Sequence, residues 1–136
     1  MKEKLAAAAK QAMMNAYAPY SEFCVGAALL CADGAVYTGC NIENAGYSAT
    51  NCAERTAFFK AISDGKKAFT AIAVCGGKNG KLTDALVSPC GICRQVMREF
   101  CDDDFEICLV TESTVKTMTL GELLPVSFGP DALKQP

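Results

Sequence analysis

Apolar residues recur at helical spacing in several parts of the chain, which predicts its main helices. The first is expected over residues 2–17, where alanine, leucine and methionine line one face until Pro19 ends the run. Two more are expected over residues 52–63 and 90–100, and a short last helix over residues 119–124. The chain therefore contains at least three amphipathic helices that need a surface to pack against.

Continuous or alternating apolar runs predict strands between these helices. Asp33-Gly34 is a strong hairpin turn between the first two runs. A glycine-rich loop begins at Gly76 and continues to Pro89. The four predicted strands cover residues 25–31, 35–40, 68–75 and 105–110. Strands that alternate with helices indicate an α/β fold, with right-handed crossovers and helices that cover a sheet.

Composition places the chain among ordinary globular proteins. Its 136 residues predict a single domain, residues 1–136, and 51% apolar with 21% charged residues is typical of such domains. The net charge is −2, and acidic and basic residues are interspersed. This argues against a partner nucleic acid, which requires a basic face, and leaves a small, weakly charged substrate open.

The cysteine content points to a reducing compartment. Nine cysteines, an odd number, without a secretory leader do not suggest a disulfide framework. The short apolar run near the start is interrupted by Lys10, too early for a signal peptide. No segment has the roughly 18 uncharged apolar residues that a membrane span requires. We therefore expect a cytoplasmic protein that does not insert into a membrane.

Three cysteines and one glutamate form the pattern that carries the chemistry. Cys52 and Glu54 stand at the start of the second predicted helix, and Cys90 and Cys93 open the third, in a chain without histidine. Three thiolates can hold a zinc ion and leave its fourth position for water, as in catalytic zinc sites. Glu54 is placed to move protons without binding the metal. This layout matches the general signature of zinc deaminases, with cysteine at all three ligand positions.

The two predicted helix starts favour thiolates, because a helix N-terminus carries partial positive charge. Cys90 and Cys93 are three residues apart and share one helix face. Three thiolates on one zinc leave a net charge of −1, which lowers its electrophilicity. Arg55 directly follows Glu54, and Arg94 directly follows Cys93. We expect both arginines to offset this charge through hydrogen bonds to sulfur.

Simpler interpretations exist for the same residues. The pair of Cys90 and Cys93 could be a redox site, and Glu54 could be a first-turn carboxylate favoured by the helix dipole. A structural zinc site would need a fourth ligand. Free cysteines in strand patterns usually pack as small hydrophobic residues, which is the role we expect for the other six: Cys24, Cys31, Cys40, Cys75, Cys101 and Cys108.

Beyond the zinc motif, several segments in order resemble cytidine deaminase. The resemblance runs from about Tyr17 to Pro125, and it is closest to the short, all-cysteine form, a homotetramer in that family. The most specific part is the block from Asn41 to Asn44. The segments that carry the resemblance are Tyr17-Ala18-Pro19-Tyr20-Ser21, Phe23, Val25-Gly26-Ala27-Ala28-Leu29, Gly39-Cys40-Asn41-Ile42-Glu43-Asn44, Asn51-Cys52-Ala53-Glu54-Arg55-Thr56-Ala57 and Ser88-Pro89-Cys90-Gly91-Ile92-Cys93-Arg94-Gln95.

The resemblance implies a fold and a reaction. The fold would be a three-layer α-β-α sandwich, with helices on a mixed sheet of about five strands. Cys52, Cys90 and Cys93 would bind one Zn²⁺ per subunit. Glu54 would take a proton from zinc-bound water and deliver it to N3 of the pyrimidine while hydroxide attacks C4. Glu54 would then protonate the leaving ammonia, and the product is uridine.

The resemblance also implies how the substrate is held. Asn41 and Glu43, two apart on an extended segment, would contact the sugar hydroxyls; without the resemblance they would be ordinary loop residues. Phe23 would form an aromatic wall of the pyrimidine pocket, or simply belong to the core. The backbone of Ala53 and Ser88 would hold the O2 and amino groups of the base. Aromatic groups near two positions would close a neighbouring subunit's pocket in the homotetramer: Tyr47 and Phe128.

Other functions fit parts of the pattern. The leading hypothesis is hydrolytic deamination of cytidine and deoxycytidine in pyrimidine salvage. A related enzyme acting on another aminopyrimidine nucleoside, such as blasticidin S, is the first alternative. A nucleic-acid editing deaminase would need a basic groove that 13 basic against 15 acidic residues do not indicate. The non-enzyme alternative is a structural zinc or redox module.

Overall fold

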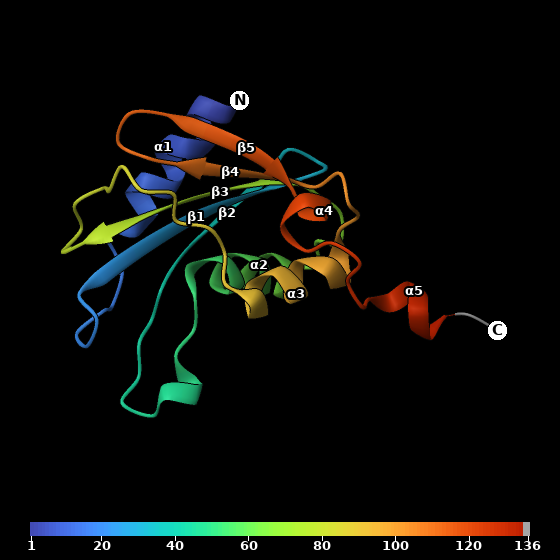
Figure 1. The fold of residues 1–136 in the computed structure, drawn as a ribbon, viewed down its shortest axis with the longest axis horizontal. Helices are drawn as coiled ribbons and strands as arrows, with labels where there is room; N and C mark the ends of the chain where they lie inside the picture. The colour runs from blue at the N-terminus through green and yellow to red at the C-terminus, as the bar shows by residue number, and fades with distance from the viewer. Residues whose placement is uncertain (135–136) are drawn as a thin grey trace.

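The computed structural model describes residues 1–134 and contains one five-stranded mixed sheet (Figure 1). The strand order is β2-β1-β3-β4-β5, and among the described strands only β3 and β4 pair in parallel, through a crossover that contains α3. Residues 135–136 of the predicted single domain lie outside the described residues. The strands are β1 (Phe23–Cys31), β2 (Val36–Cys40), β3 (Phe69–Lys78), β4 (Glu106–Val110) and β5 (Val115–Thr119).

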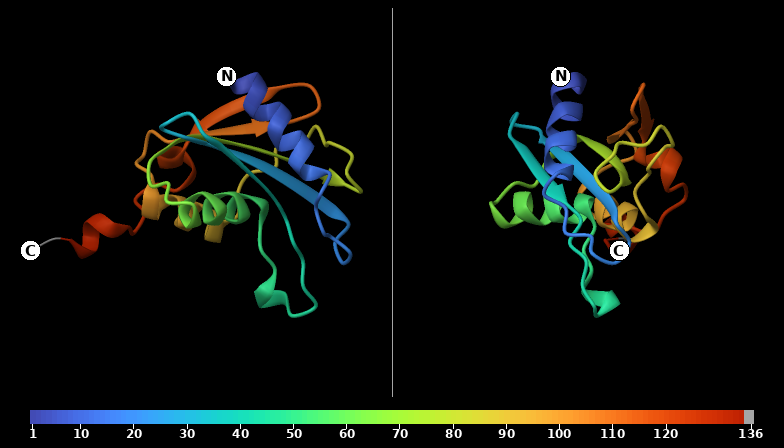
Figure 2. Two further views of the ribbon diagram at one scale, coloured as in Figure 1. Left: turned by 180° about the vertical axis from the view of Figure 1, so that it is seen from behind. Right: turned by 90° about the vertical axis from the view of Figure 1, so that its left-hand side faces the viewer.

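Helices cover both faces of the sheet, which confirms the predicted α-β-α layers. The first helix lies on one face, and the next three lie on the other (Figures 1 and 2). Two short elements project from this body: the 3-10 turn η1 and the C-terminal helix α5 (Figure 1). The helical elements are α1 (Lys2–Met13), η1 (Tyr47–Ala49), α2 (Ala53–Ser63), α3 (Gly91–Phe100), α4 (Leu120–Leu123) and α5 (Pro130–Leu133).

Each face of the sheet has its own hydrophobic core. Under α2 and α3 the core is built around Phe58, whose ring centroid lies 5.1 Å from that of Phe69 and 6.0 Å from that of Phe105. Under α1 the core consists mainly of alanines, with Leu5 and Met13 as its larger members. Small side chains on this face let the helix lie close to the strands.

The first helix is four residues shorter than predicted. It ends at Met13, although the apolar spacing continues to Tyr17. The Tyr17 N–H donates to the Asn41 carbonyl at 3.0 Å, and the Glu43 N–H donates to the Tyr17 carbonyl at 2.8 Å. Pairing with a segment distant in the sequence therefore replaces the last helical turn.

The strands differ from the prediction at two places. The glycine-rich segment predicted as loop continues β3 as far as Lys78, because β1 provides partners up to the pair of Phe23 and Lys78. Strand β5 lies in a segment that was not predicted as a strand, and this edge strand has exposed and half-buried side chains. The predicted final helix is α4, with Thr119 as its N-cap residue.

All nine cysteines are free thiols in the structure. Outside the motif, four of the six are buried, as expected for residues that pack in a core: Cys31, Cys75, Cys101 and Cys108. Cys24 and Cys40 are half-buried, and Cys24 packs against the core under α1. Burial raises the pKa of Cys75 to about 11, which keeps this thiol protonated and unreactive.

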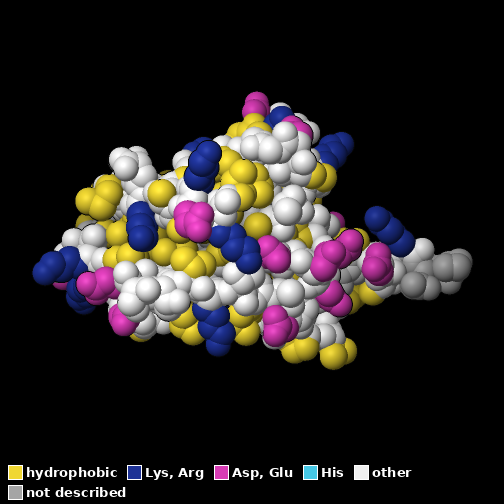
Figure 3. All heavy atoms as spheres, turned by 90° about the horizontal axis from the view of Figure 1, so that it is seen from above, with side chains coloured by type: hydrophobic (Ala, Val, Ile, Leu, Met, Phe, Trp, Pro, Cys, Tyr) yellow, Lys and Arg dark blue, Asp and Glu magenta, His cyan; other side chains and the backbone are white. Residues whose placement is uncertain are grey.

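The surface carries mixed charge. Seen from above in Figure 3, basic and acidic side chains are interspersed among apolar ones over this face, in agreement with the net charge of −2. None of the helices in the described part of the chain is both long and apolar enough to cross a membrane.

Candidate active site

The sulfur atoms of Cys52, Cys90 and Cys93 converge on one point. The Cys52 and Cys90 Sγ atoms lie 3.8 Å apart, the Cys90 and Cys93 Sγ atoms 3.5 Å apart, and all three within 4.8 Å of one another. A tetrahedral zinc with Zn–S bonds of about 2.3 Å places its sulfurs about 3.8 Å apart. The cluster therefore fits zinc. Within the described residues no fourth protein ligand joins it, so one position is left for water or substrate.

Two helix starts bring these ligands together. Cys52 is the N-cap residue of α2 and Cys90 the N-cap residue of α3, both with extended backbone angles, and Cys93 lies in the first turn of α3. Helices α2 and α3 lie side by side on one face of the sheet (Figures 1 and 2). The partial positive charge at both N-termini thus acts on the same three sulfurs.

The electrostatics of the cluster favour a bound cation. Hydrogen bonding with Cys93, and then with Arg55, lowers the pKa of the Cys52 thiol to about 5. The same interaction with Cys52, together with burial, raises the pKa of Cys93. One negative charge is thus shared between these two sulfurs, and a bound cation would favour their thiolate forms.

Arg55 lies where the sequence analysis places it. Its Nη2 atom donates to the Cys52 Sγ at 3.3 Å, and the neighbouring thiolates raise its pKa. Its Nε atom is buried and has no hydrogen-bond partner within the described structure. The guanidinium is therefore oriented by sulfur rather than by a carboxylate, which is an unusual surrounding for a half-buried arginine.

Arg94 has different partners from those expected. Its Nε atom donates to the Pro89 carbonyl at 2.7 Å and its Nη2 atom to the Ser88 Oγ at 3.1 Å. Its Nη1 atom donates to the carbonyl of Leu123. All three guanidinium nitrogens thus donate to oxygen, and the expected hydrogen bond from Arg94 to sulfur is not formed.

Glu54 is buried beside the ligands. It lies in the first turn of α2 and is 4% exposed. Burial raises the pKa of its carboxyl group to about 7, and the charge of Cys52 adds to this shift. A carboxyl group with a pKa near neutrality can both accept and return a proton, as general acid–base catalysis requires.

One cavity connects the metal ligands to the predicted substrate residues. It has a volume of about 260 Å³. Of the sequence-predicted residues, eight line it: Phe23, Asn41, Glu43, Cys52, Ala53, Glu54, Ser88 and Cys90. Five other lining residues were not singled out from the sequence: Ser21, Val25, Thr50, Asn51 and Val87. Ser21 and Asn51 lie inside or next to the sequence motifs, so their position in the sequence could have indicated that they line the site.

Asn41 and Glu43 are held in place by backbone groups. The Asn41 Oδ1 atom accepts from the Val25 N–H at 2.9 Å, and its Nδ2 atom donates to the Phe23 carbonyl at 2.8 Å. Glu43 accepts from the Tyr20 N–H at 2.9 Å and from the Ser21 N–H and hydroxyl. The hydroxyl and amide donors lower the pKa of Glu43, which keeps it ionised. Each side chain retains free hydrogen-bonding capacity.

Tyr47 and Phe128 do not line this cavity. Tyr47 is 85% exposed and borders an adjoining open groove that shares Ser21, Glu43 and Thr50 with the cavity. Phe128 is 62% exposed in the segment before α5. Both aromatic residues are therefore largely exposed in the structure.

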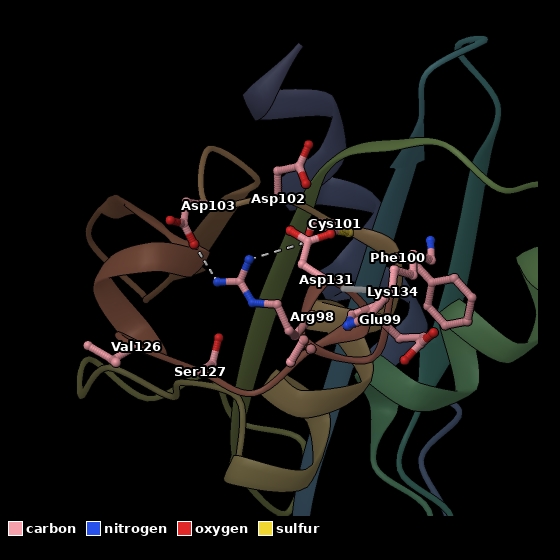
Figure 4. A pocket seen from close by; sticks show the side chains of 13 residues that line it. Arg98, Glu99, Phe100, Cys101, Asp102, Asp103, Val126, Ser127, Asp131 and Lys134 are labelled. Atoms are coloured by element: carbon pink, nitrogen blue, oxygen red, sulfur yellow. Dashed lines mark hydrogen bonds and ion pairs between the residues drawn. The ribbon is translucent and has the colours of Figure 1, made fainter. Parts of the chain in front are cut away.

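A second hollow is separate from the metal ligands. It has a volume of about 410 Å³ and lies between the end of α3 and the C-terminal segment (Figure 4). Arg98 lines it and is paired with Asp103, and Asp131 and Lys134 are also among the lining residues. None of the three ligand cysteines lines this hollow.

Comparisons with known proteins agree with the geometry. The family model described as "Cytidine and deoxycytidylate deaminase zinc-binding region" matches residues 1–109. A cytidine deaminase from Sporosarcina psychrophila is 52% identical over 132 residues, which cover 96% of this chain and 93% of that protein. The crystal structure of cytidine deaminase from Burkholderia pseudomallei has a TM-score of 0.86 and 46% identity, and the match covers 94% of this chain and 99% of that one. A blasticidin-S deaminase from Bacillus cereus is 34% identical over 107 residues, 76% of each chain.

Proposed function

The chain belongs to the cytidine and deoxycytidylate deaminase family, and we propose that it hydrolyses cytidine and deoxycytidine to uridine and deoxyuridine with release of ammonia. The observation that carries this proposal is the shared cavity, where Cys52, Cys90 and the buried Glu54 face the same space as Asn41 and Glu43. The same cavity thus holds the groups for hydrolysis and the groups for a sugar.

The roles of the protein residues follow from their positions. Cys52, Cys90 and Cys93 hold zinc, which when bound makes a water molecule nucleophilic near neutral pH. Glu54 takes a proton from the attacking water and delivers it to N3 of the pyrimidine, which makes C4 easier to attack. Glu54 then takes the second proton of that water, from the hydroxyl on C4, and gives it to the amino group, so that the C4 carbonyl forms and the C4–N bond breaks to release ammonia. Its pKa of about 7 suits both transfers.

Asn41 and Glu43 bind the sugar hydroxyls through the hydrogen-bonding positions that their protein partners leave free. The Asn41 amide keeps one N–H and one lone pair, and the Glu43 carboxylate keeps one acceptor position. Because backbone groups already fix both side chains, little conformational entropy is lost when a hydroxyl binds. Phe23 and the backbone of Ala53 and Ser88 complete the pocket for the base.

The test is a substrate comparison with metal quantification. The purified protein is assayed by ultraviolet absorbance with cytidine, deoxycytidine and blasticidin S, and zinc is measured in the same samples. We expect one zinc per subunit and turnover of both cytidine nucleosides. Turnover of blasticidin S alone would replace the proposed substrate, and zinc without any turnover would favour the structural module.

The blasticidin S alternative rests on one finding, the 34% identity to a blasticidin-S deaminase. The zinc motif alone does not separate the two substrates. The higher identity to cytidine deaminases and the sugar-binding capacity at Asn41 and Glu43 favour cytidine.

Assembly and location extend the proposal. We infer a homotetramer in which neighbouring subunits complete each pocket, supported by the exposed rings of Tyr47 and Phe128 on projecting segments (Figure 1). We also infer a cytoplasmic enzyme of pyrimidine salvage. The nine free thiols support a reducing compartment.

A further inference from the structure

Arg94 connects the segment that carries a zinc ligand to a distant helix. Two of its nitrogens donate to the Ser88–Pro89 segment, at 2.7 Å to the Pro89 carbonyl and 3.1 Å to the Ser88 Oγ. The third donates to the carbonyl of Leu123, the last residue of α4. The carbonyls of a last helical turn lack partners within the helix, so the arginine satisfies one of them.

Helix α4 is a rigid anchor for this bridge. The Thr119 hydroxyl and the Glu122 carboxylate form a reciprocal capping box at its start. Leu120 is fully buried in the core under α2 and α3. A hydrogen bond to the end of α4 therefore ties its partner to the sheet and core.

The other end of the bridge borders the cavity. Ser88 lines the cavity, and Pro89 is fully buried. The next residue, Cys90, is both a zinc ligand and the N-cap residue of α3. Cys90 has no side-chain capping bond of its own. The position of this segment thus depends on the three planar donors of one guanidinium.

We propose that Arg94 is a positioning residue: its guanidinium holds Ser88, Pro89 and Cys90 against α4, so that the cavity wall at Ser88 keeps its place relative to the zinc site. The role depends on the shape of the guanidinium rather than on its charge, because a lysine has one donor atom and cannot span three oxygens. The kinetic test of this inference rests on the proposed function. A second test measures the position of the Ser88–Pro89 segment and does not depend on that function.

The test compares Arg94→Lys with Arg98→Lys. Arg98 lies one turn further along α3, also holds oxygen partners, and borders the separate hollow in Figure 4. We expect Arg94→Lys to lower kcat for cytidine about tenfold or more, since a displacement of about 1 Å can cost a hundredfold. KM and zinc content should stay within about threefold of wild type, and Arg98→Lys should keep wild-type kcat.

A milder variant keeps the test valid if Arg94→Lys does not fold. Ser88→Ala removes only the bond to Nη2, and kcat should fall a few-fold with zinc retained. The proposal is overturned if folded Arg94→Lys keeps wild-type kcat. If Arg94→Lys does not fold, wild-type kcat in Ser88→Ala overturns it. Loss of zinc in parallel with activity in folded Arg94→Lys would also overturn the proposal, because Arg94 would then act by retaining the metal.

A structural readout separates this inference from the proposed substrate. Crystal structures of wild type and of a folded variant, Arg94→Lys or Ser88→Ala, should show the Ser88–Pro89 segment moved away from α4. An unmoved segment would overturn the proposal whichever nucleoside the wild-type protein turns over. Absence of wild-type activity on cytidine, with the segment displaced, would count only against the proposed substrate.

Discussion

Glu54 acquires its chemistry from its surroundings. In water a glutamate is fully ionised at neutral pH, but burial at the start of α2 raises its pKa to about 7. Cys52, two residues earlier, shows the opposite shift, since hydrogen bonds from Cys93 and Arg55 lower its pKa to about 5. Two residues at one helix start thus have pKa values shifted in opposite directions, as the proposed roles in proton transfer and metal binding require.

Glu54→Gln should remove catalysis and leave the metal site intact. Glutamine has nearly the same shape but cannot accept and return a proton, so we expect turnover to fall by about 10²–10⁴ or more. Zinc content and melting temperature are measured beside kcat. The exposed Glu112 provides a control, Glu112→Gln, which should keep full activity. A Glu54→Gln protein with more than a tenth of wild-type turnover would contradict the assigned role.

Arg55→Gln should weaken zinc binding or slow turnover. The Arg55 Nη2 atom lies 3.3 Å from the Cys52 Sγ, and its charge offsets part of the charge of three thiolates. Loss of such a partner typically changes metal affinity or activity about 10- to 100-fold. Competition with a chelator measures the affinity, and Arg55→Lys should recover part of it because the charge remains. The idea fails if Arg55→Gln leaves both quantities unchanged.

Helix placement depends on two glycines in the sheet, one under each helical layer. A Cβ atom on Gly39 would lie 2.4 Å from the Ala53 carbonyl oxygen in α2. A Cβ atom on Gly26 would lie 2.1 Å from the Ala9 carbonyl oxygen in α1. Both contacts are with backbone, so the helix itself must move when a side chain is added. Of these two helices, α2 carries zinc-site residues at its start and α1 carries none.

Gly39→Ala and Gly26→Ala should therefore have different consequences. Both should destabilise the protein by about 1–3 kcal/mol, measured by urea unfolding. Gly39→Ala should also lower the zinc bound per folded chain and the turnover, because the start of α2 shifts. Gly26→Ala displaces α1 on the opposite face and should keep zinc and activity in the folded fraction. Equal loss of zinc in both variants would contradict this assignment.

In the described part of the chain, two projecting segments carry largely exposed apolar side chains. One carries η1, with Tyr47, and the other carries α5 and the residues before it, with Phe128 and Val126. Figure 1 shows both extending from the layered body. Exposed aromatic rings on extended segments are typical of surfaces that pack against another subunit. The proposed homotetramer would place these rings in contact with neighbouring subunits.

Phe128→Ala should weaken assembly and activity together. An aromatic ring at the centre of an interface commonly contributes about 2 kcal/mol or more, so the dissociation constant should rise about thirtyfold. Sedimentation over a range of concentrations measures the assembly, and kcat/KM is followed at the same concentrations. Val115→Ala, another exposed apolar residue at the sheet edge, is the control. Unchanged assembly and activity in Phe128→Ala would count against Phe128 as an interface residue.

The sequence by itself determined the metal ligands, the class of chemistry and most elements. These features are local: Cys90 and Cys93 are three residues apart at a helix start, and Asp33-Gly34 forms a hairpin turn through its own backbone preferences. The order of the segments that resemble cytidine deaminase was also enough to indicate the family, which the comparisons then confirmed.

Only the tertiary structure decided the features that depend on distant partners. The end of α1 is set by the pairing of Tyr17 with the segment after β2, and the edge strand β5 is defined by its pairing with β4 rather than by its own mostly polar residues. Arg94 could be predicted to lie beside the motif, but its three oxygen partners come from two separate segments. Sequence spacing reports contacts within a helix or turn, whereas contacts across the chain depend on how these elements pack.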